Sequence, residues 1–143
     1  MTTVKQLLDF KGHDVITIGP ECTVYEALER LAVREIGALL VIEQDKLVGL
    51  FSERDYARKV ILKGKSSKDT PVSDVMARDI IAVSPGTSVD ECMSLMTVNR
   101  VRHLPVLDDG VLIGIISIGD AVRQLLSEKD FTIQQLEKYI VSG

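Results

Sequence analysis

The sequence predicts an α/β (α+β) fold built from two tandem copies of one β-α-β-β-α unit. Shifting the chain by 65 residues aligns 15–63 with 80–128 without a gap. Along this alignment most non-identical pairs replace one residue with a similar one, as in Leu28/Met93. In each copy a short β-branched run, which predicts a strand, is followed by an apolar stripe with the period of a helix. A register kept over this length indicates an internal repeat.

The first strand and helix of each copy follow one pattern. Short β-branched runs at 15–18 and 80–83 predict strands. Capping boxes beginning at Thr23 and Ser88 then predict helix starts. The buried face of each helix is predicted by an apolar stripe, made of Val24, Ala27, Leu28, Leu31 and Ala32 in the first copy and of Val89, Cys92, Met93 and Met96 in the second.

The remainder of each copy predicts a hairpin and a second helix. Two apolar runs are separated by a short polar turn at 43–46 in the first copy and at 108–110 in the second, which is typical of paired antiparallel strands. A second helix follows each hairpin. In the first copy its predicted buried stripe is Ala57, Val60 and Ile61, and Gly64 is placed to end it.

Polar and flanking segments divide the chain. The stretch 65–71 is rich in Lys and Ser and ends in Pro, which predicts a linker, and 72–76 predicts one helical turn. Val4, Leu7 and Leu8 form an apolar stripe near the N-terminus. A capping box beginning at Thr132 predicts the start of a last helix with Ile133, Leu136 and Ile140 on one face. We therefore expect one module over 1–143, with motifs at 3–64 and 72–128 and a C-terminal helix at 129–143.

Composition narrows the function classes. The net charge of −4 argues against a nucleic-acid binder, which normally carries a basic face. No apolar run approaches the ~20 residues that span a bilayer, and the first residues do not resemble a signal or transit peptide. We expect a cytoplasmic protein with no membrane partner. Cys22 and Cys92 fall at different places in the two copies, so reduced structural thiols are expected, with neither a disulfide nor a metal site.

The junction between the hairpin and the second helix carries the groups of greatest chemical interest. The stretch 49–55 places a hydroxyl at Ser52 and a carboxylate at Asp55, and 114–120 repeats this with Ser117 and Asp120. A helix N-terminus attracts anions, and a carboxylate one turn later can accept hydrogen bonds from a ribose diol. The same residues also satisfy the capping-box pattern, so each junction taken alone is read as a cap. The repetition of the whole arrangement favours a binding site.

Basic residues near these junctions differ between the copies. Arg54 and Arg58 share a helix face and are placed to clamp a phosphate, although taken alone they are better explained as a solvated face with Glu53 and Asp55. In the second copy Gly119 replaces Arg54. The pair Arg102 and His103 precedes the second strand there and adds cationic or donor groups, although His103 taken alone is better explained as a surface or hydrogen-bonded histidine.

At this point residues 3–128 resemble the CBS-domain family, specifically a Bateman module of two tandem CBS motifs. The resemblance is carried by 49–55 and 114–120, which match a Gly-h-h-Ser/Thr-x-x-Asp element, by 102–106 and by 72–76. It implies that the two motifs pack about a pseudo-twofold axis and leave two clefts for adenosine nucleotides. The implied ligand-binding residues are Asp14, Val15, Ile36 and Gly37 for adenine in one cleft, Asp79, Ile80, Val101 and Arg102 in the other, Asp55 and Asp120 for ribose, Ser52 and Ser117 for phosphate, Arg54, Arg58, Arg102 and His103 around the phosphates, and Leu104, Pro105 and Gly119 beside them.

The resemblance implies a regulatory sensor with no catalytic residues, no catalytic cofactor and no metal. AMP is the first expected ligand, with ATP and NAD as alternatives, and the cleft of Ser117 and Asp120 is expected to fill first. The implied partners are a second copy in a homodimer and an unidentified regulated protein. A constitutive interaction scaffold with empty clefts is the alternative. An enzyme is disfavoured because the sequence has no metal-ligand cluster and neither cysteine has an identifiable histidine partner.

Overall fold

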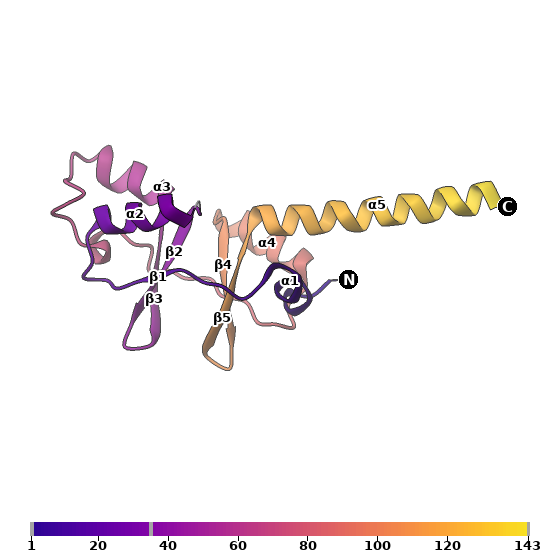
Figure 1. Cartoon of the computed structure of the whole chain (residues 1–143), viewed down its shortest axis with the longest axis horizontal. Helices are drawn as coiled ribbons and strands as arrows, with labels where there is room; N and C mark the ends of the chain where they lie inside the picture. The colour runs from indigo at the N-terminus through magenta and orange to yellow at the C-terminus, as the bar shows by residue number, and fades with distance from the viewer. Residues whose placement is uncertain (1, 35, 143) are drawn as a thin grey trace. The chain divides into compact units, whose positions relative to one another are not determined.

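The chain forms two compact units in a computed structural model that describes residues 2–34 and 36–142, with side chains to residue 138. One unit consists of 14–81, and the other combines 1–13 with 82–143. The elements have the mixed α+β composition that the sequence predicts, and Figure 1 labels them along the chain.

The unit of residues 14–81 is built on a three-stranded sheet in the order β1-β2-β3. Strand β1 pairs parallel with β2, and β2 pairs antiparallel with β3 through the predicted hairpin. The predicted strand at 15–18 is shortened to two residues. The elements are β1 (Thr17–Ile18), α2 (Val24–Arg34), β2 (Ala38–Glu43) and β3 (Lys46–Ser52), followed by α3 (Glu53–Asp55), a π-helix (Tyr56–Ile61) and a 3-10 helix (Val72–Asp74).

The core of this unit confirms most of the first helical stripe. Val24, Ala27 and Leu31 of α2 are buried against the sheet residues Leu39 and Phe51. The same core also contains Val60 of the π-helix and Val72, Val75 and Met76 of the segment that follows the linker.

The second helix of the first copy departs from the prediction. It begins as α3 at the Ser52 cap but continues as a π-helix, in which the amide of Leu62 donates to the carbonyl of Ala57. The wider turn of a π-helix changes which residues share a face. Val60 alone of the predicted stripe is buried, whereas Ala57 and Ile61 are exposed, so that part of the prediction is wrong.

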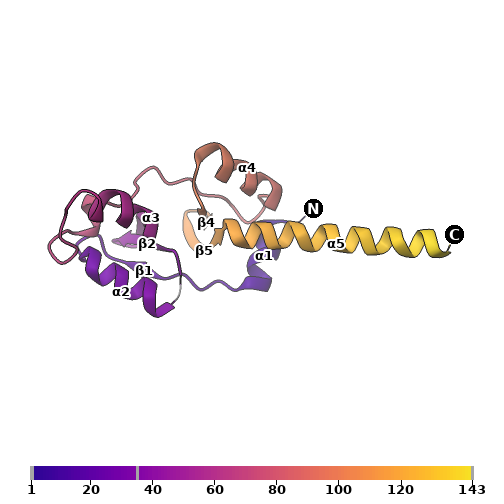
Figure 2. The same cartoon turned by 90° about the horizontal axis from the view of Figure 1, so that it is seen from above.

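The other unit combines N-terminal residues with the second copy. Strands β4 and β5 form the predicted antiparallel hairpin, and α4 packs beside the first part of α5 (Figure 2). The predicted turn of helix at 72–76 is confirmed, but it belongs to the unit described above. The elements of this second unit are α1 (Val4–Lys11), α4 (Val89–Asn99), β4 (His103–Asp108), β5 (Val111–Ser117) and α5 (Ile118–Ser142).

The predicted strand at 80–83 is reduced to a single parallel bridge between Val83 and Val106. In the first copy the amide of Leu40 donates to the carbonyl of Ile16, at 3.1 Å. Pro105 stands at the position equivalent to Leu40 and has no N–H to donate. The ladder therefore cannot extend toward residue 81 as it does in the first copy.

Each lead-in segment packs against the other copy of the repeat. Helix α1 buries Val4, Leu7 and Leu8, as predicted, and its first amides donate to the carbonyls of Thr87 and Pro85. Leu8 lies against Gly114, where an added Cβ would come within 2.7 Å of the Leu8 Cδ2.

The 72–77 segment makes the matching contact with the first copy. The backbones of Leu50 and Ala77 exchange two hydrogen bonds, and the Met76 side chain occupies the space beside Gly49. The two structural units are therefore out of phase with the two sequence motifs.

Helix α5 runs without a break from Ile118 to Ser142, so the prediction of a separate helix beginning at Thr132 is wrong. The Thr132 hydroxyl donates to the carbonyl of Glu128 at 3.0 Å, a bond typical of a helix interior. Residues 129–138 are all exposed, and this part of α5 extends beyond α1 and α4 of its own unit (Figures 1 and 2). The Ile140 side chain, predicted on the same face as Leu136, lies outside the described side chains.

Candidate functional site

The junction at Ser52 forms the predicted capping box. The Ser52 amide donates to the Asp55 Oδ2 at 2.9 Å, and the Asp55 amide donates back to the Ser52 Oγ at 3.2 Å. The Ser52 hydroxyl also donates to the Asp55 Oδ2 at 3.0 Å. The Lys59 Nζ lies 3.1 Å from the Asp55 Oδ1 and donates to the carbonyl of Val75. The lead-in segment of the second copy is thereby tied to the carboxylate of the first.

The junction at Ser117 repeats this arrangement, but two cationic side chains contact its carboxylate where one contacts Asp55. The Ser117 amide donates to the Asp120 Oδ2 at 2.9 Å, and the Asp120 amide donates to the Ser117 Oγ at 3.1 Å. The Lys11 Nζ reaches the Asp120 Oδ2 at 2.6 Å and donates to the carbonyl of Ile115, while the Arg123 guanidinium donates to the Asp120 Oδ1 at 2.8 Å. Two cations therefore hold one carboxylate.

Asp120 is only 8% exposed, yet its carboxylate remains ionised. Burial alone raises the pKa of a carboxyl group. Here the hydrogen bonds from Lys11 and from the Ser117 amide, together with the Lys11 charge, outweigh burial and hold the pKa of Asp120 below its ordinary value. The site is therefore an anionic acceptor whose charge is already compensated.

The two carboxylates differ in how easily a further donor is admitted. A carboxylate offers about four lone-pair positions, and a vicinal diol requires two of them. At Asp55 the present donors are one amide, one lysine and the freely rotating hydroxyl of Ser52. At Asp120 they are one amide and the two cations Lys11 and Arg123. A diol can replace a rotating hydroxyl at Asp55, whereas at Asp120 it must displace a cation or the backbone.

His103 lies next to the Asp120 junction because its backbone pairs with Ser117 across the hairpin. Burial lowers the pKa of His103, and the positive charges of Lys11 and Arg102 lower it further, against a smaller raising effect of Asp120. A neutral imidazole is therefore favoured at this position.

The backbone around these junctions is arranged in the same way in both copies. The carbonyl of Arg102 accepts the amide of Ile118 at 2.9 Å, and the carbonyl of Gly37 accepts the amide of Glu53 at 3.1 Å. The structure thus brings Arg102 and Gly37 next to the predicted junctions.

The other predicted site residues have varied positions. Leu104 is fully buried and belongs to the core, Pro105 is buried, and Gly119 and Val101 are partly exposed. Arg54 and Arg58 are exposed. The remaining positions flank strands or loops of the 14–81 unit: Asp14 and Val15 before β1, Ile36 before β2, and Asp79 and Ile80 after the 3-10 helix.

Two lysines of the site were missed by the sequence reasoning. Lys59 follows Asp55 by four residues on the same helical stretch, which is a detectable ion-pair spacing. Lys11 is 109 residues away from Asp120, so only the fold reveals that contact.

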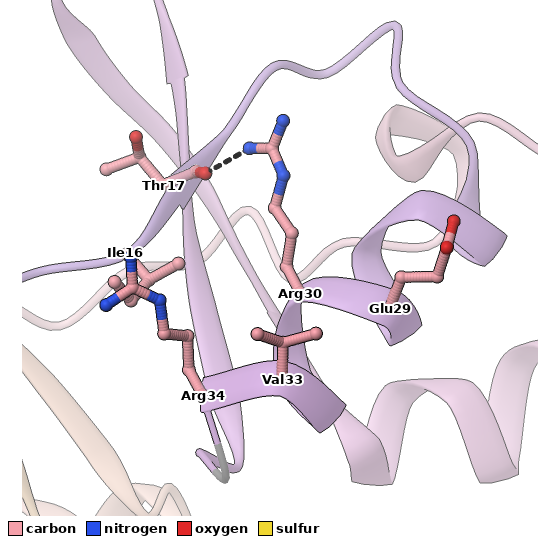
Figure 3. A pocket seen from close by; sticks show the side chains of 6 residues that line it. All are labelled: Ile16, Thr17, Glu29, Arg30, Val33 and Arg34. Atoms are coloured by element: carbon pink, nitrogen blue, oxygen red, sulfur yellow. Dashed lines mark hydrogen bonds between the residues drawn. The ribbon is translucent and has the colours of Figure 1, made fainter.

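A surface pocket of about 390 Å³ lies between β1 and the exposed side of α2. Figure 3 shows the Arg30 guanidinium donating to the carbonyl of Thr17, at 2.5 Å, with Arg34 on the Ile16 side of the pocket. Two arginines four residues apart, beside the apolar stripe of α2, are the sequence signal for this pocket. Its lining residues are Ile16, Thr17, Glu29, Arg30, Val33 and Arg34.

Of the two cysteines, Cys92 is buried and Cys22 is partly exposed. Burial raises the pKa of Cys92 to about 11, which leaves its thiol protonated and unreactive at neutral pH. Over residues 2–34 and 36–142 no group of three His, Cys, Asp or Glu side chains is placed to hold a metal ion. In the same residues no helix is long and apolar enough to cross a membrane.

Comparison with known proteins gives consistent matches over this chain. The family model described as "CBS domain" matches residues 5–62 and 72–127. The mitochondrial CBS domain-containing protein CBSX3 of Arabidopsis thaliana is 40% identical over 151 residues, covering 99% of this chain and 73% of that protein. A putative signal-transduction protein with CBS domains from Burkholderia ambifaria has a structure with a TM-score of 0.85 and 48% identity, covering 88% of this chain and 95% of that one. The CBS domain pair of protein MJ0100, in complex with 5′-methylthioadenosine and S-adenosyl-L-methionine, has a TM-score of 0.79 and 25% identity, covering 90% of this chain and 98% of that one.

Proposed function

Because this chain belongs to the CBS-domain family and carries two tandem CBS repeats, we propose that it is a regulatory module that senses an adenosine nucleotide and controls a partner protein. The observation that carries the proposal is the Ser-x-x-Asp junction, which occurs twice with the same backbone arrangement and with a carboxylate as hydrogen-bond acceptor. The adenosine ligands bound to the MJ0100 domain pair support this ligand class.

In this proposal Asp55 and Asp120 accept the ribose hydroxyls, and the serine at each helix start faces the phosphate. We propose that Asp55 accepts ribose first, because only the Ser52 hydroxyl needs to rotate away from it. This reverses the order expected from the sequence. AMP is the first candidate, followed by ATP and NAD. Exposed Arg54 and Arg58 supply cations for the phosphates.

The ligand acts by shifting a conformational equilibrium. A ligand biases such an equilibrium only through different affinities for the two states. The lysines at both carboxylates connect each junction to a lead-in segment, Lys11 directly within α1 and Lys59 through the carbonyl of Val75. Ribose binding that competes for these lysines would therefore loosen a lead-in segment. The regulated protein, a homodimeric assembly and a cytoplasmic location complete the proposal.

Isothermal titration calorimetry of the full chain with AMP, ATP, NAD and S-adenosylmethionine tests the proposal. We expect binding of at least one nucleotide, and a larger loss of affinity in Asp55→Asn than in Asp120→Asn. Each variant preserves the shape of the side chain and removes its charge. Absence of binding by all four ligands at millimolar concentration contradicts the proposal.

A constitutive interaction scaffold is the second candidate, and the exposed apolar residues of α5 favour it. The two functions differ in their dependence on the carboxylates. If Asp55→Asn and Asp120→Asn leave control of the partner protein unchanged, the scaffold is supported and the sensor is not.

A further inference from the structure

The surface pocket between β1 and α2 is a second candidate binding site. Its volume of about 390 Å³ lies at the lower end of the ~300–1,000 Å³ that is typical of small-molecule sites. All of its lining residues belong to the 14–81 unit, and they differ from the residues implied for nucleotide binding. The nucleotide proposal therefore leaves this pocket unexplained.

The Arg30 side chain is fixed by the open edge of the sheet. Strand β1 is an edge strand, because the sheet order is β1-β2-β3. The carbonyl of Ile16 accepts the amide of Leu40 in β2, so the next carbonyl, that of Thr17, faces the open edge. Arg30 donates to this carbonyl, as Figure 3 shows. A guanidinium has five N–H donors, so Arg30 keeps donors for a ligand.

Arg34 and Val33 give the pocket features that protection of the strand edge does not explain. Covering an edge strand requires only the Arg30 bond. Arg34 lies one helical turn after Arg30, on the Ile16 side of the pocket, so the two guanidiniums border one space (Figure 3). Within the described residues neither arginine forms an ion pair. Val33 lines the same space, and its 79% exposure makes it an apolar wall that a ligand could cover.

We propose that this pocket binds a small organic carboxylate with a compact apolar body. The carboxylate group accepts hydrogen bonds from Arg30 and Arg34, whose planar guanidiniums match its geometry. The apolar body packs against Val33 and Ile16. The proposal goes beyond nucleotide sensing and does not depend on it.

The charges of the pocket favour a carboxylate over a phosphate. Arg30 and Arg34 contribute two positive charges and Glu29 contributes one negative charge, which leaves a net charge of +1 in the lining. A monoanion neutralises this charge. A phosphate monoester carries about −1.5 to −2 charges at neutral pH, so it exceeds the positive charge of the pocket and is repelled by Glu29.

Titration of the full chain, followed by heteronuclear NMR, tests the proposal with isovalerate and benzoate as probes. We expect saturable shifts of the Thr17 and Arg30 amides with at least one probe at millimolar concentration. The neutral amide of that probe should bind at least about tenfold more weakly, because it forms no charge-assisted hydrogen bonds with the guanidiniums.

Arg34→Gln should weaken binding of the carboxylate by a similar factor. Lys46→Gln is the matched control, because it removes an exposed positive charge of the same unit outside the pocket. It should bind the probe as the parent protein does. Circular dichroism verifies that both variants keep their helices.

Several outcomes overturn the proposal. They include the absence of saturable shifts with both carboxylates, and equal binding of a carboxylate by Arg34→Gln and the parent. Inorganic phosphate that binds as tightly as the carboxylates would make the pocket a general anion site. If AMP shifts the Thr17 and Arg30 amides and displaces the probe, the pocket belongs to the nucleotide cleft. A failed nucleotide titration leaves the carboxylate results unchanged, so the two proposals fail separately.

Discussion

Replacing Lys11 with Met should destabilise the protein through Asp120. The substitution keeps most of the aliphatic stem of Lys11 and removes the ammonium group that lies 2.6 Å from the Asp120 Oδ2. The side chains of the pair are 30% and 9% exposed, so Asp120 cannot recover this interaction fully from water. A hydrogen bond to a charged, buried group contributes about 1.5–3 kcal/mol, and we expect a loss of about 2 kcal/mol in the free energy of unfolding.

Lys59→Met is the matched control at the other junction. Its ion pair with Asp55 is longer, at 3.1 Å, and more exposed, with side chains 43% and 14% accessible. An i,i+4 pair of this kind contributes about 0.5 kcal/mol. Urea unfolding followed by circular dichroism measures both variants under the same conditions. Equal losses in the two variants would refute the conclusion that burial makes the Lys11 bond the stronger one.

The pH dependence gives a second measurement on the same variant. The pKa of Asp120 is lower in the folded protein than in the unfolded chain, so its stabilisation is fully present above the unfolded value of about 4 and is lost as the pH falls through the folded value. The difference between Lys11→Met and the parent should therefore shrink below about pH 4. A difference that stays constant down to the acid transition would assign the loss to packing of the lysine stem.

Three further predictions follow from packing and titration. The pKa of His103 is lower in the folded protein, so the unfolded chain binds the His103 proton more tightly, and the free energy of unfolding should fall as the pH drops below about 6.5. In urea unfolding, His103→Asn should flatten this part of the pH profile. Gly114→Ala should cost about 1–3 kcal/mol because its Cβ meets Leu8, and a double mutant with Leu8→Ala should lose less than the sum of the two single losses in the same assay. Val60→Ala should cost about 1–3 kcal/mol, whereas Ile61→Ala should change stability by no more than about 0.5 kcal/mol; equal melting temperatures would contradict the π-helical register.

Features that depend on nearby residues could be predicted from the sequence. The capping boxes at Ser52 and Ser117 and both hairpins need only a few consecutive residues, and the 65-residue repeat made each of them visible twice. The family and the mixed fold followed from these local signals and are confirmed.

Features that depend on distant residues could not be predicted. The Lys11 bond to Asp120 joins segments 109 residues apart, and the change to a π-helix after Asp55 has no recognised sequence signal. The sequence does contain the reason for the missing strand at 80–83. Pro105 lacks the N–H that Leu40 donates in the first copy, but the importance of this donor is evident only once its acceptor, the carbonyl of Ile16, is known.

The offset between sequence motifs and structural units bears on how such a chain arose. The face of each hairpin at Gly49 or Gly114 is covered by a lead-in segment that belongs to the other copy. A precursor with one copy would have left this face bare unless two such chains exchanged their lead-in segments. In this chain both lead-in segments and both hairpins belong to one polypeptide, so each exchange is made within it. Circular permutants cut after residue 13 or after residue 81 should therefore be more stable than a permutant cut in the linker at 65–71. The first two cuts fall between the structural units, whereas the third falls within one of them.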